Sequence, residues 1–252
     1  MTEPGDHPHD PRLVLLHGFT QTAGCWGPVG DDLARDHEVV RLDAPGHGIA
    51  TDVRAGLVEG AALMATTGGR GVWVGYSMGA RLALHVALGH PEVVEGLVLI
   101  GGTPGIEDDV ERAARRARDH ELATHVREIG VDAFLTEWLD QPLFLGLPAW
   151  ARFDEERRRN TAEGLASSLE LAGTGSQQSL WPRLDELRVP VLAVAGTHDI
   201  RYADIASRTA EAVGPHAMVA LVPGAGHAAH LEQPEAFLAH LRPWLATFPR
   251  VV

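Results

Sequence analysis

The residues best able to do chemistry in this chain lie in the segment Gly75-Tyr76-Ser77-Met78-Gly79-Ala80-Arg81. Its G-x-S-x-G pattern is typical of a sharp strand-to-helix turn that exposes a serine hydroxyl, because the flanking glycines leave room that a Cβ would fill. A helix that begins directly after the serine directs its N-terminal N–H groups at whatever the serine attacks. Ser77 is therefore the candidate nucleophile or base of an active site.

Arg81 adds a cation to this turn. It follows Ser77 by four residues, which is about one turn of the predicted helix. Helical side chains lean toward the helix N-terminus, so we expect the guanidinium to point back toward the pocket of the serine. A typical esterase keeps this pocket apolar, and Arg81 therefore indicates an anionic substrate.

A reactive serine needs a base that takes its proton and a carboxylate that orients the base. Asp199 and His227 supply both in the chain order that accompanies G-x-S-x-G turns, and each follows a predicted strand. Loops after parallel strands open on one sheet edge, so the three residues can converge. His198 and His230 are alternative bases, but His198 precedes the acid and His230 begins the next predicted helix.

Two backbone N–H groups are expected to stabilise negative charge on an oxygen of the substrate. One belongs to Met78, directly after the serine, and the other to Phe19 in the loop Leu16-His17-Gly18-Phe19-Thr20. This loop follows the first predicted core strand and occupies the place of the His-Gly oxyanion motif. The alternative is that the loop is an ordinary glycine turn.

The elements that must position these residues are short apolar runs closed by glycine and followed by helical stretches. Continuous apolar runs are typical of strands buried on both faces, and the helical stretches between them are the crossovers that a parallel sheet requires. We predict an α/β fold with a mostly parallel sheet of about six or seven strands flanked by helices. The predicted strands cover residues 13–16, 39–42, 72–74, 97–100, 191–194 and 218–222.

The alternation breaks once, because about 90 residues between Ile100 and Val191 contain no strand-like run. Helices are predicted there over 109–120, 131–139 and 154–171. An insertion after one strand of an open sheet lies above the strand ends where ligands bind. We therefore predict a helical cap over 105–185 within one domain, an α/β core over 12–104 and 186–252, and a polar N-terminal tail over 1–11.

Composition limits the partners. A formal net charge of -13 disfavours binding to nucleic acid or to an anionic membrane surface, since both require dense Lys and Arg. The N-terminus lacks the basic and apolar regions of a secretory signal, and no apolar run is long enough to span a bilayer. We expect a cytoplasmic protein without membrane insertion, as either a monomer or a homo-oligomer.

Arginines are frequent in the predicted cap, at 112, 115, 116, 118, 152, 157, 158 and 159. A charge run on a helix is usually a solvated face with acidic partners, such as Glu111 four residues before Arg115. In an acidic protein, however, a positive cleft is a local exception that suits an anionic substrate.

These motifs resemble those of the α/β-hydrolase superfamily and, within it, of the 2-succinyl-6-hydroxy-2,4-cyclohexadiene-1-carboxylate synthases of menaquinone biosynthesis. The likeness runs from about residue 12 to residue 247. G-x-S-x-G and His-Gly-Phe are common to the superfamily, whereas the arginine after the turn and two cap segments are narrower. The matching segments are 17–20, 45–48, 75–81, 102–105, 111–113, 137–138, 141–144, 159–160, 173–177 and 180–181.

The resemblance implies a carbon–oxygen lyase without cofactor or metal. Such synthases eliminate pyruvate from 2-succinyl-5-enolpyruvyl-6-hydroxy-3-cyclohexene-1-carboxylate, and the triad removes a ring proton through the serine. For a small-molecule polycarboxylate of this kind, guanidiniums are the expected partners. The resemblance implies that the substrate is held by the side chains of Arg81, Arg115, Arg159, Tyr76 and Trp138.

Two other functions remain open at this point. A serine hydrolase, either a carboxylesterase or a C–C bond hydrolase, would use the same triad on the same fold. A binding or receptor protein without activity is also known for this fold, but an intact triad disfavours it. One departure from the family pattern concerns His198 and Ile200, which stand beside Asp199 where charged neighbours are expected.

Overall fold

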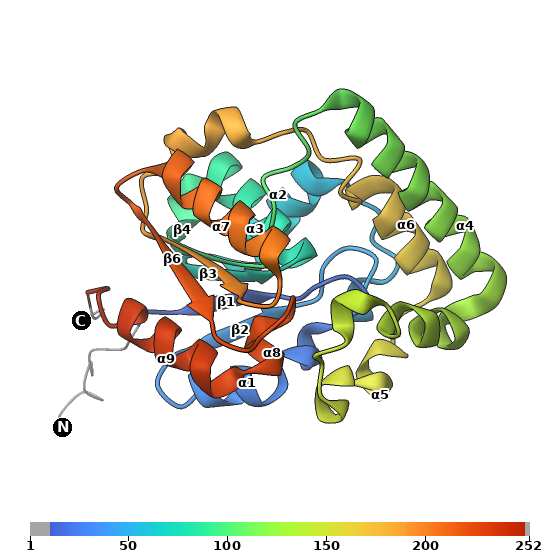
Figure 1. The fold of residues 1–252 in the computed structure, drawn as a ribbon, viewed down its shortest axis with the longest axis horizontal. Coiled ribbons are helices and arrows are strands. Elements are labelled where there is room, and N and C mark those ends of the chain that lie inside the picture. Colours follow the sequence, from blue (N-terminus) through green and yellow to red (C-terminus); the bar gives the residue numbers. More distant parts are fainter. Residues whose placement is uncertain (1–10, 250–252) are drawn as a thin grey trace, which may run out of the picture.

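The protein, seen in a computed structural model that describes residues 11–249, is built on a six-stranded sheet in which all neighbouring strands are parallel. The strand order is β2-β1-β3-β4-β5-β6. This sheet, flanked by helices, confirms the predicted fold class (Figure 1). The strands are β1 (Leu13–Leu16), β2 (Val39–Leu42), β3 (Gly71–Tyr76), β4 (Val94–Ile100), β5 (Val191–Gly196) and β6 (Ala217–Val222).

Helices cover both faces of the sheet (Figure 1). Alternate residues along each strand point to opposite faces, so each strand contributes to two apolar clusters. One face packs against α2 (Leu57–Gly68), α3 (Met78–Gly89) and α7 (Ile200–Val213). The other packs against α1 (Gly27–Leu33), α8 (Ala229–Glu232) and α9 (Pro234–Leu245). Short 3₁₀ turns join these elements at 23–26, 48–50, 91–93 and 181–186.

The strand order creates a crevice between β1 and β3. The chain leaves β1 toward β2 on one side and then returns to form β3 on the other side of β1. Loops that leave neighbouring strands in opposite directions open a crevice at their carboxyl ends, where ligands bind in such sheets. Leu16 pairs in register with Gly75, so the loop after β1 and the turn at Ser77 lie side by side at this crevice.

The connection from β4 to β5 forms a helical cap beside the carboxyl ends of the strands (Figure 1). It contains α4 (Asp109–Leu139), α5 (Asp154–Arg157) and α6 (Ala162–Ala172), with 3₁₀ turns at 142–144 and 149–152. The cap has an apolar core of its own, in which α4 packs against α6. This core contains Ala123, Val126, Phe134, Leu165, Ala166 and Leu169.

The cap helices differ in their bounds from the sequence expectation. The helices expected over 109–120 and 131–139 are parts of α4, which is interrupted only at Gly130, where φ is 77°. The helix expected over 154–171 is divided into α5 and α6, because the Thr161 side chain accepts the Gly164 N–H at 3.0 Å and starts a new helix. Residues 1–10 of the predicted polar tail lie outside the described residues.

None of the helices within residues 11–249 combines the length and the apolar composition that a bilayer crossing requires.

Four histidines should make the fold sensitive to acid. Burial lowers the pKa of His17, that of His47 and His230 to about 3, and that of the partly buried His85 to about 4. In the unfolded chain each titrates near pH 6.5, so between these values the unfolded state binds more protons than the folded state. The free energy of unfolding should therefore fall below about pH 6.5, by roughly 1 kcal/mol per histidine between pH 7.5 and pH 5.5.

Urea unfolding at these two pH values measures the effect. His198→Gln, at an exposed site, should leave the difference unchanged, whereas His230→Phe should reduce it by roughly 1 kcal/mol. Equal free energies of unfolding at both pH values would show that these histidines are protonated in the folded protein.

Candidate active site

Ser77 occupies the turn between β3 and α3 in a strained backbone conformation, with φ 51° and ψ -106°. A Cβ at Gly75 would lie 2.3 Å from the Gly79 carbonyl oxygen, and one at Gly79 would lie 2.2 Å from the Leu16 carbonyl oxygen. Only glycine therefore fits on either side of the serine. The Ser77 N–H donates to the Ile100 carbonyl oxygen at 2.8 Å and fixes the turn to β4.

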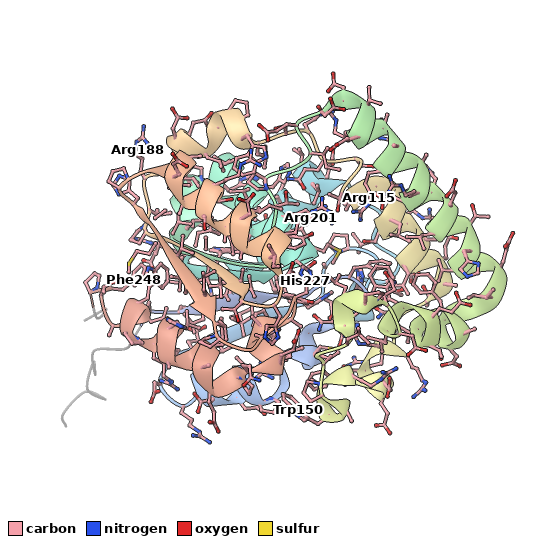
Figure 2. The ribbon with its side chains drawn as sticks, in the orientation of Figure 1. Arg115, Trp150, Arg188, Arg201, His227 and Phe248 are labelled. Carbon is pink, nitrogen blue, oxygen red and sulfur yellow. The ribbon has the colours of Figure 1, made fainter. Side chains whose placement is uncertain are left out.

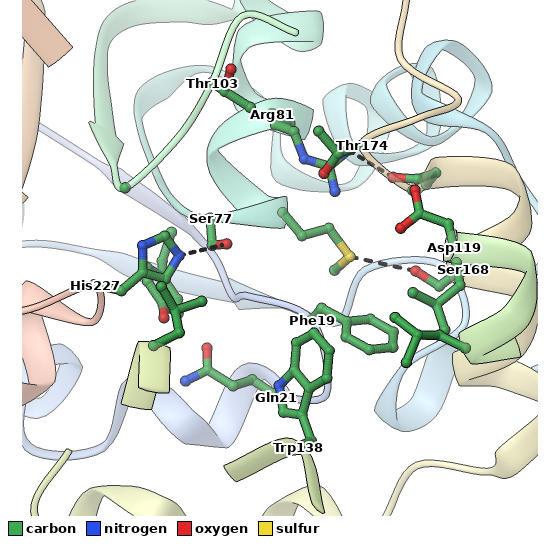
Figure 3. A pocket seen from close by; sticks show the side chains of 18 of the residues that line it. Phe19, Gln21, Ser77, Arg81, Thr103, Asp119, Trp138, Ser168, Thr174 and His227 are labelled. Atoms are coloured by element: carbon green, nitrogen blue, oxygen red, sulfur yellow. Dashed lines mark hydrogen bonds between the residues drawn. The ribbon is translucent and has the colours of Figure 1, made fainter. Parts of the chain in front are cut away.

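The structure brings Ser77, Asp199 and His227 together from three loops at the crevice. His227 Nε2 lies 3.1 Å from Ser77 Oγ (Figure 3), and His227 Nδ1 lies 2.8 Å from Asp199 Oδ2. The Asp199 carboxylate also caps α7 by accepting the Tyr202 N–H at 3.2 Å, so it is held in place. Because a carboxylate faces Nδ1, this nitrogen carries the proton, and Nε2 is free to accept the serine proton.

Neither alternative histidine contacts the serine. His198 is exposed on the loop after β5. His230 is buried, with ring centroids 4.9 Å from Trp26 and 4.6 Å from Tyr76. Burial lowers the pKa of His230, so the side chain stays neutral where α8 packs into the apolar core.

Two backbone N–H groups beside Ser77 are free to bind an oxygen. Met78 is the first residue of α3, so its N–H has no acceptor within the helix. In the described part of the chain, the Phe19 N–H also donates to no acceptor. The loop around it is fixed, because the Gly18 N–H donates to Gln21 Oε1 at 2.9 Å and the Thr20 N–H donates to His47 Nε2 at 3.3 Å.

A cavity of about 300 Å³ lies over Ser77, between the sheet and the cap. Arg115 on α4 and His227 after β6 lie on its two sides (Figure 2). Its apolar wall includes Phe19, Tyr76, Leu122, Trp138, Leu143 and Phe144. Its polar wall includes four arginines at 81, 115, 118 and 157. It also includes Gln21, Thr103, Asp119, Ser168 and Thr174, which Figure 3 shows together with Arg81.

Two of these arginines are buried without a carboxylate partner. Arg81 is 7% exposed, donates from Nη1 to the Ala172 carbonyl oxygen at 2.7 Å, and has its pKa lowered to about 10 by burial. Arg157 is 2% exposed and donates to the Arg152 carbonyl oxygen at 2.6 Å and to Thr20 Oγ1. Neither forms an ion pair within residues 11–249. A buried cation without a counterion is unfavourable, so both guanidiniums suit an anion that a ligand supplies.

Arg115 and Arg118 complete the positive wall from α4. Arg115 is partly exposed, and its Nε donates to Asp119 Oδ1 at 2.8 Å. Arg118 is exposed at the cavity. Arg116, next to Arg115, instead binds the Gly175 carbonyl oxygen at 3.2 Å and does not line the cavity.

Arg159, expected from the sequence to bind substrate, is not among the residues that line the cavity. Its side chain is 50% exposed and pairs with Glu156 at 2.9 Å. Arg157 lies in the cavity instead, because residues two positions apart in a helical turn point about 200° apart. Arg158 and Arg159 both have acidic partners, Asp132 and Glu156, whereas Arg157 has none among the described residues.

Tyr76 and Trp138 line the cavity as expected from the sequence. The Tyr76 ring lies 5.5 Å from the His227 ring, and burial raises the pKa of its hydroxyl, which stays neutral. Trp138 packs edge-to-face on Phe19 with ring centroids 5.1 Å apart. The cap thereby contacts the loop that carries the Phe19 N–H. Sequence reasoning missed Gln21, Asp119 and Ser168, and it named Arg157 only as one of the cap arginines.

Within residues 11–249, no three His, Cys, Asp or Glu side chains gather in a metal-binding arrangement.

Comparison with known proteins places the chain among related sequences and structures. The alpha/beta hydrolase family model matches residues 13–240. A 2-succinyl-6-hydroxy-2,4-cyclohexadiene-1-carboxylate synthase of Serratia proteamaculans is 32% identical over 244 residues, which cover 93% of each protein. The enzyme of this name from Photorhabdus laumondii is 33% identical over 247 residues, covering 94% of this chain and 86% of that protein. The structure of MenH from S. aureus matches with a TM-score of 0.88 at 27% identity over 96% of each chain.

Proposed function

The chain belongs to the alpha/beta hydrolase family and, within it, to the 2-succinyl-6-hydroxy-2,4-cyclohexadiene-1-carboxylate synthases of menaquinone biosynthesis, and we propose that it eliminates pyruvate from 2-succinyl-5-enolpyruvyl-6-hydroxy-3-cyclohexene-1-carboxylate. One observation carries the proposal. A serine bonded to histidine opens into a cavity that holds two buried arginines, and neither has a carboxylate partner in the described part of the chain. An ordinary acyl pocket has no use for these cations, whereas a polycarboxylate requires them.

In the proposed reaction the serine acts as a base. His227 Nε2 accepts the Ser77 hydroxyl proton as Ser77 Oγ takes the proton from the ring carbon that bears the succinyl carbonyl. The electron pair of the broken C–H bond first forms an enolate with the succinyl carbonyl. When the enolate collapses back to the ketone, this pair forms the first new ring double bond, the existing ring double bond shifts, and the bond from the ring to the enolpyruvyl oxygen breaks. The proton held by His227 passes to the leaving enolpyruvate or to water, and enolpyruvate tautomerises to pyruvate. Asp199 stabilises the histidinium meanwhile.

The remaining groups of the cavity match the charge of this substrate. The N–H groups of Phe19 and Met78 stabilise the enolate oxygen that forms from the succinyl carbonyl when the proton leaves. Arg81, Arg157 and Arg115 bind the succinyl, ring and enolpyruvyl carboxylates, with Arg157 in the role first expected of Arg159. Tyr76 and Trp138 enclose the ring. No step requires a cofactor.

Purified protein with the enolpyruvyl substrate tests the proposal. We expect one pyruvate per diene formed, at a rate that a metal chelator does not change, and negligible turnover of simple aryl esters. Rapid hydrolysis of the esters without pyruvate release would instead favour the serine hydrolase, which needs the same triad.

The variant Arg81→Ala further distinguishes the proposed lyase from a serine hydrolase. Loss of a buried guanidinium that binds a carboxylate should lower kcat/KM for pyruvate release by about a hundredfold or more. A hydrolase that binds an apolar acyl group in this pocket would lose little activity in the same variant. The measurements are kcat/KM for pyruvate release, in a coupled assay, and the rate of aryl ester hydrolysis, each for the wild type and for the variant. Equal small effects in both assays would contradict a role of Arg81 in binding the substrate.

A further inference from the structure

Asp119 is the single acidic residue among the described residues that line the cavity. It is fully buried on α4, close to Arg115 in the sequence. A negative charge in this place repels a polycarboxylate, and its burial is costly unless both of its oxygens have donors. Its presence therefore requires a role other than contact with the substrate.

Each carboxylate oxygen of Asp119 has one donor, and the donors belong to different elements. Oδ1 accepts from Arg115 Nε at 2.8 Å within α4. Oδ2 accepts the Gly175 N–H at 2.9 Å, across the cavity wall in the turn that follows α6. Figure 3 shows Asp119 close to Thr174, with Arg81 on the other side of that turn.

The turn that Asp119 holds also carries the partner of Arg81. Arg81 Nη1 donates to the carbonyl oxygen of Ala172, the last residue of α6. The Ser176 N–H donates to the Gly173 carbonyl oxygen at 3.0 Å, so the turn is closed by its own backbone. A Cβ at Gly173 would lie 2.6 Å from Asp119 Oδ2, which shows how closely the carboxylate is packed against it.

We propose that Asp119 is a positioning residue that directs the Arg115 guanidinium and, through the Gly175 turn, fixes the distance between Arg115 and Arg81. The inference rests on the proposed function, because the distance between these cations matters only for a ligand with several carboxylates. Asp119 thereby selects the spacing of carboxylates that the cavity accepts, although its charge alone opposes anion binding.

The variant Asp119→Asn separates a positioning role from a purely electrostatic one, because the two roles predict opposite changes in KM. An amide has an acceptor oxygen at only one of the two positions that face Arg115 and Gly175, and its NH₂ group faces the other donor. If Asp119 positions the cations, KM for the enolpyruvyl substrate should rise about tenfold or more while kcat changes by less than about threefold. If the charge alone matters, KM should fall, because a repulsive carboxylate has been removed. An unchanged or lower KM overturns the inference.

Asp109→Asn is the matched control. Asp109 is an exposed residue of the same helix, paired with Arg112 outside the cavity, so its loss should leave KM unchanged. If Asp119→Asn does not fold, Arg115→Lys tests the same contact from the other side. It keeps the charge but loses the planar group that Asp119 directs, so KM should again rise about tenfold. An unchanged KM in Arg115→Lys overturns the inference.

Calorimetric binding of citrate, a tricarboxylate probe, distinguishes failure of the inference from failure of the proposed function. Weaker citrate binding by Asp119→Asn than by the wild type supports positioning even if no pyruvate is released, in which case only the proposed reaction fails. Tighter citrate binding by the variant overturns the inference even if the wild type releases pyruvate.

Discussion

Replacing Ser77 with alanine is expected to lower kcat for pyruvate release by about a thousandfold or more. His227 Nε2 is bonded to Ser77 Oγ, and no other hydroxyl within the described residues is bonded to this nitrogen. Removing the hydroxyl therefore leaves the histidine without the group that, in the proposed mechanism, takes the ring proton. Steady-state pyruvate release, with circular dichroism to show that the fold is retained, measures the loss.

Ser77→Gly is the matched control for backbone strain. Both variants should lose activity, but glycine adopts φ 51° without the cost that a Cβ imposes, so it should unfold at higher urea concentration than the alanine variant. If Ser77→Ala keeps more than about a tenth of the wild-type kcat, the base is another group, and the proposed mechanism is wrong.

Replacing Arg157 with methionine is expected to lower kcat/KM by about a hundredfold or more, mainly through KM. Methionine fills much of the volume of the buried side chain but offers no positive charge to a carboxylate. Because Arg157 is buried at the cavity and has no acidic partner within residues 11–249, we expect its charge to bind the ligand rather than a surface carboxylate. Steady-state kinetics of pyruvate release give the change.

Arg159→Met provides the comparison at the neighbouring position. Arg159 is half exposed and pairs with Glu156 outside the cavity lining, so kcat/KM should change by less than about threefold. A large effect at Arg159 together with a small one at Arg157 would restore the assignment made from the sequence and contradict the geometry.

The core of the candidate site follows from local sequence and chain order. Ser77 lies in a turn that only flanking glycines allow, and Asp199 and His227 follow strands that end at the same sheet edge. Parallel strands fix where such loops open, so the convergence of the three side chains needed no knowledge of packing. The loop that carries Phe19 could be located for the same reason.

The cap was harder to predict because its residues are placed by contacts between distant segments. The arginines at 157–159 are consecutive, and the rotation of the short helix α5 about its axis decides which of them faces the cavity. The helix α5 ends at the first of these arginines. No motif marks that end, because the break depends on the Thr161 cap and on the Asn160 contact with the Thr20 carbonyl oxygen. A helix of one turn is too short for the spacing of apolar residues to show which side of it faces the cavity.

Asp119 illustrates the same limit. Along the sequence it belongs to a charged helix surface, where a solvated carboxylate is the ordinary expectation. Its burial follows from the Gly175 N–H, a donor 56 residues away in the chain. The close approach of α4 to the turn after α6 decides the role of this residue.

The fate of water oxygen during turnover tests most directly whether Ser77 and His227 remove a proton rather than cleave an acyl bond. The measurement is mass spectrometry of the diene product formed in water labelled with heavy oxygen. Elimination breaks the bond between the ring and the enolpyruvyl oxygen without adding water, so we predict pyruvate release with no label in the carboxylates of the diene. Incorporation of one labelled oxygen into a product carboxylate, without formation of the diene and pyruvate, would contradict elimination and assign the site to hydrolysis.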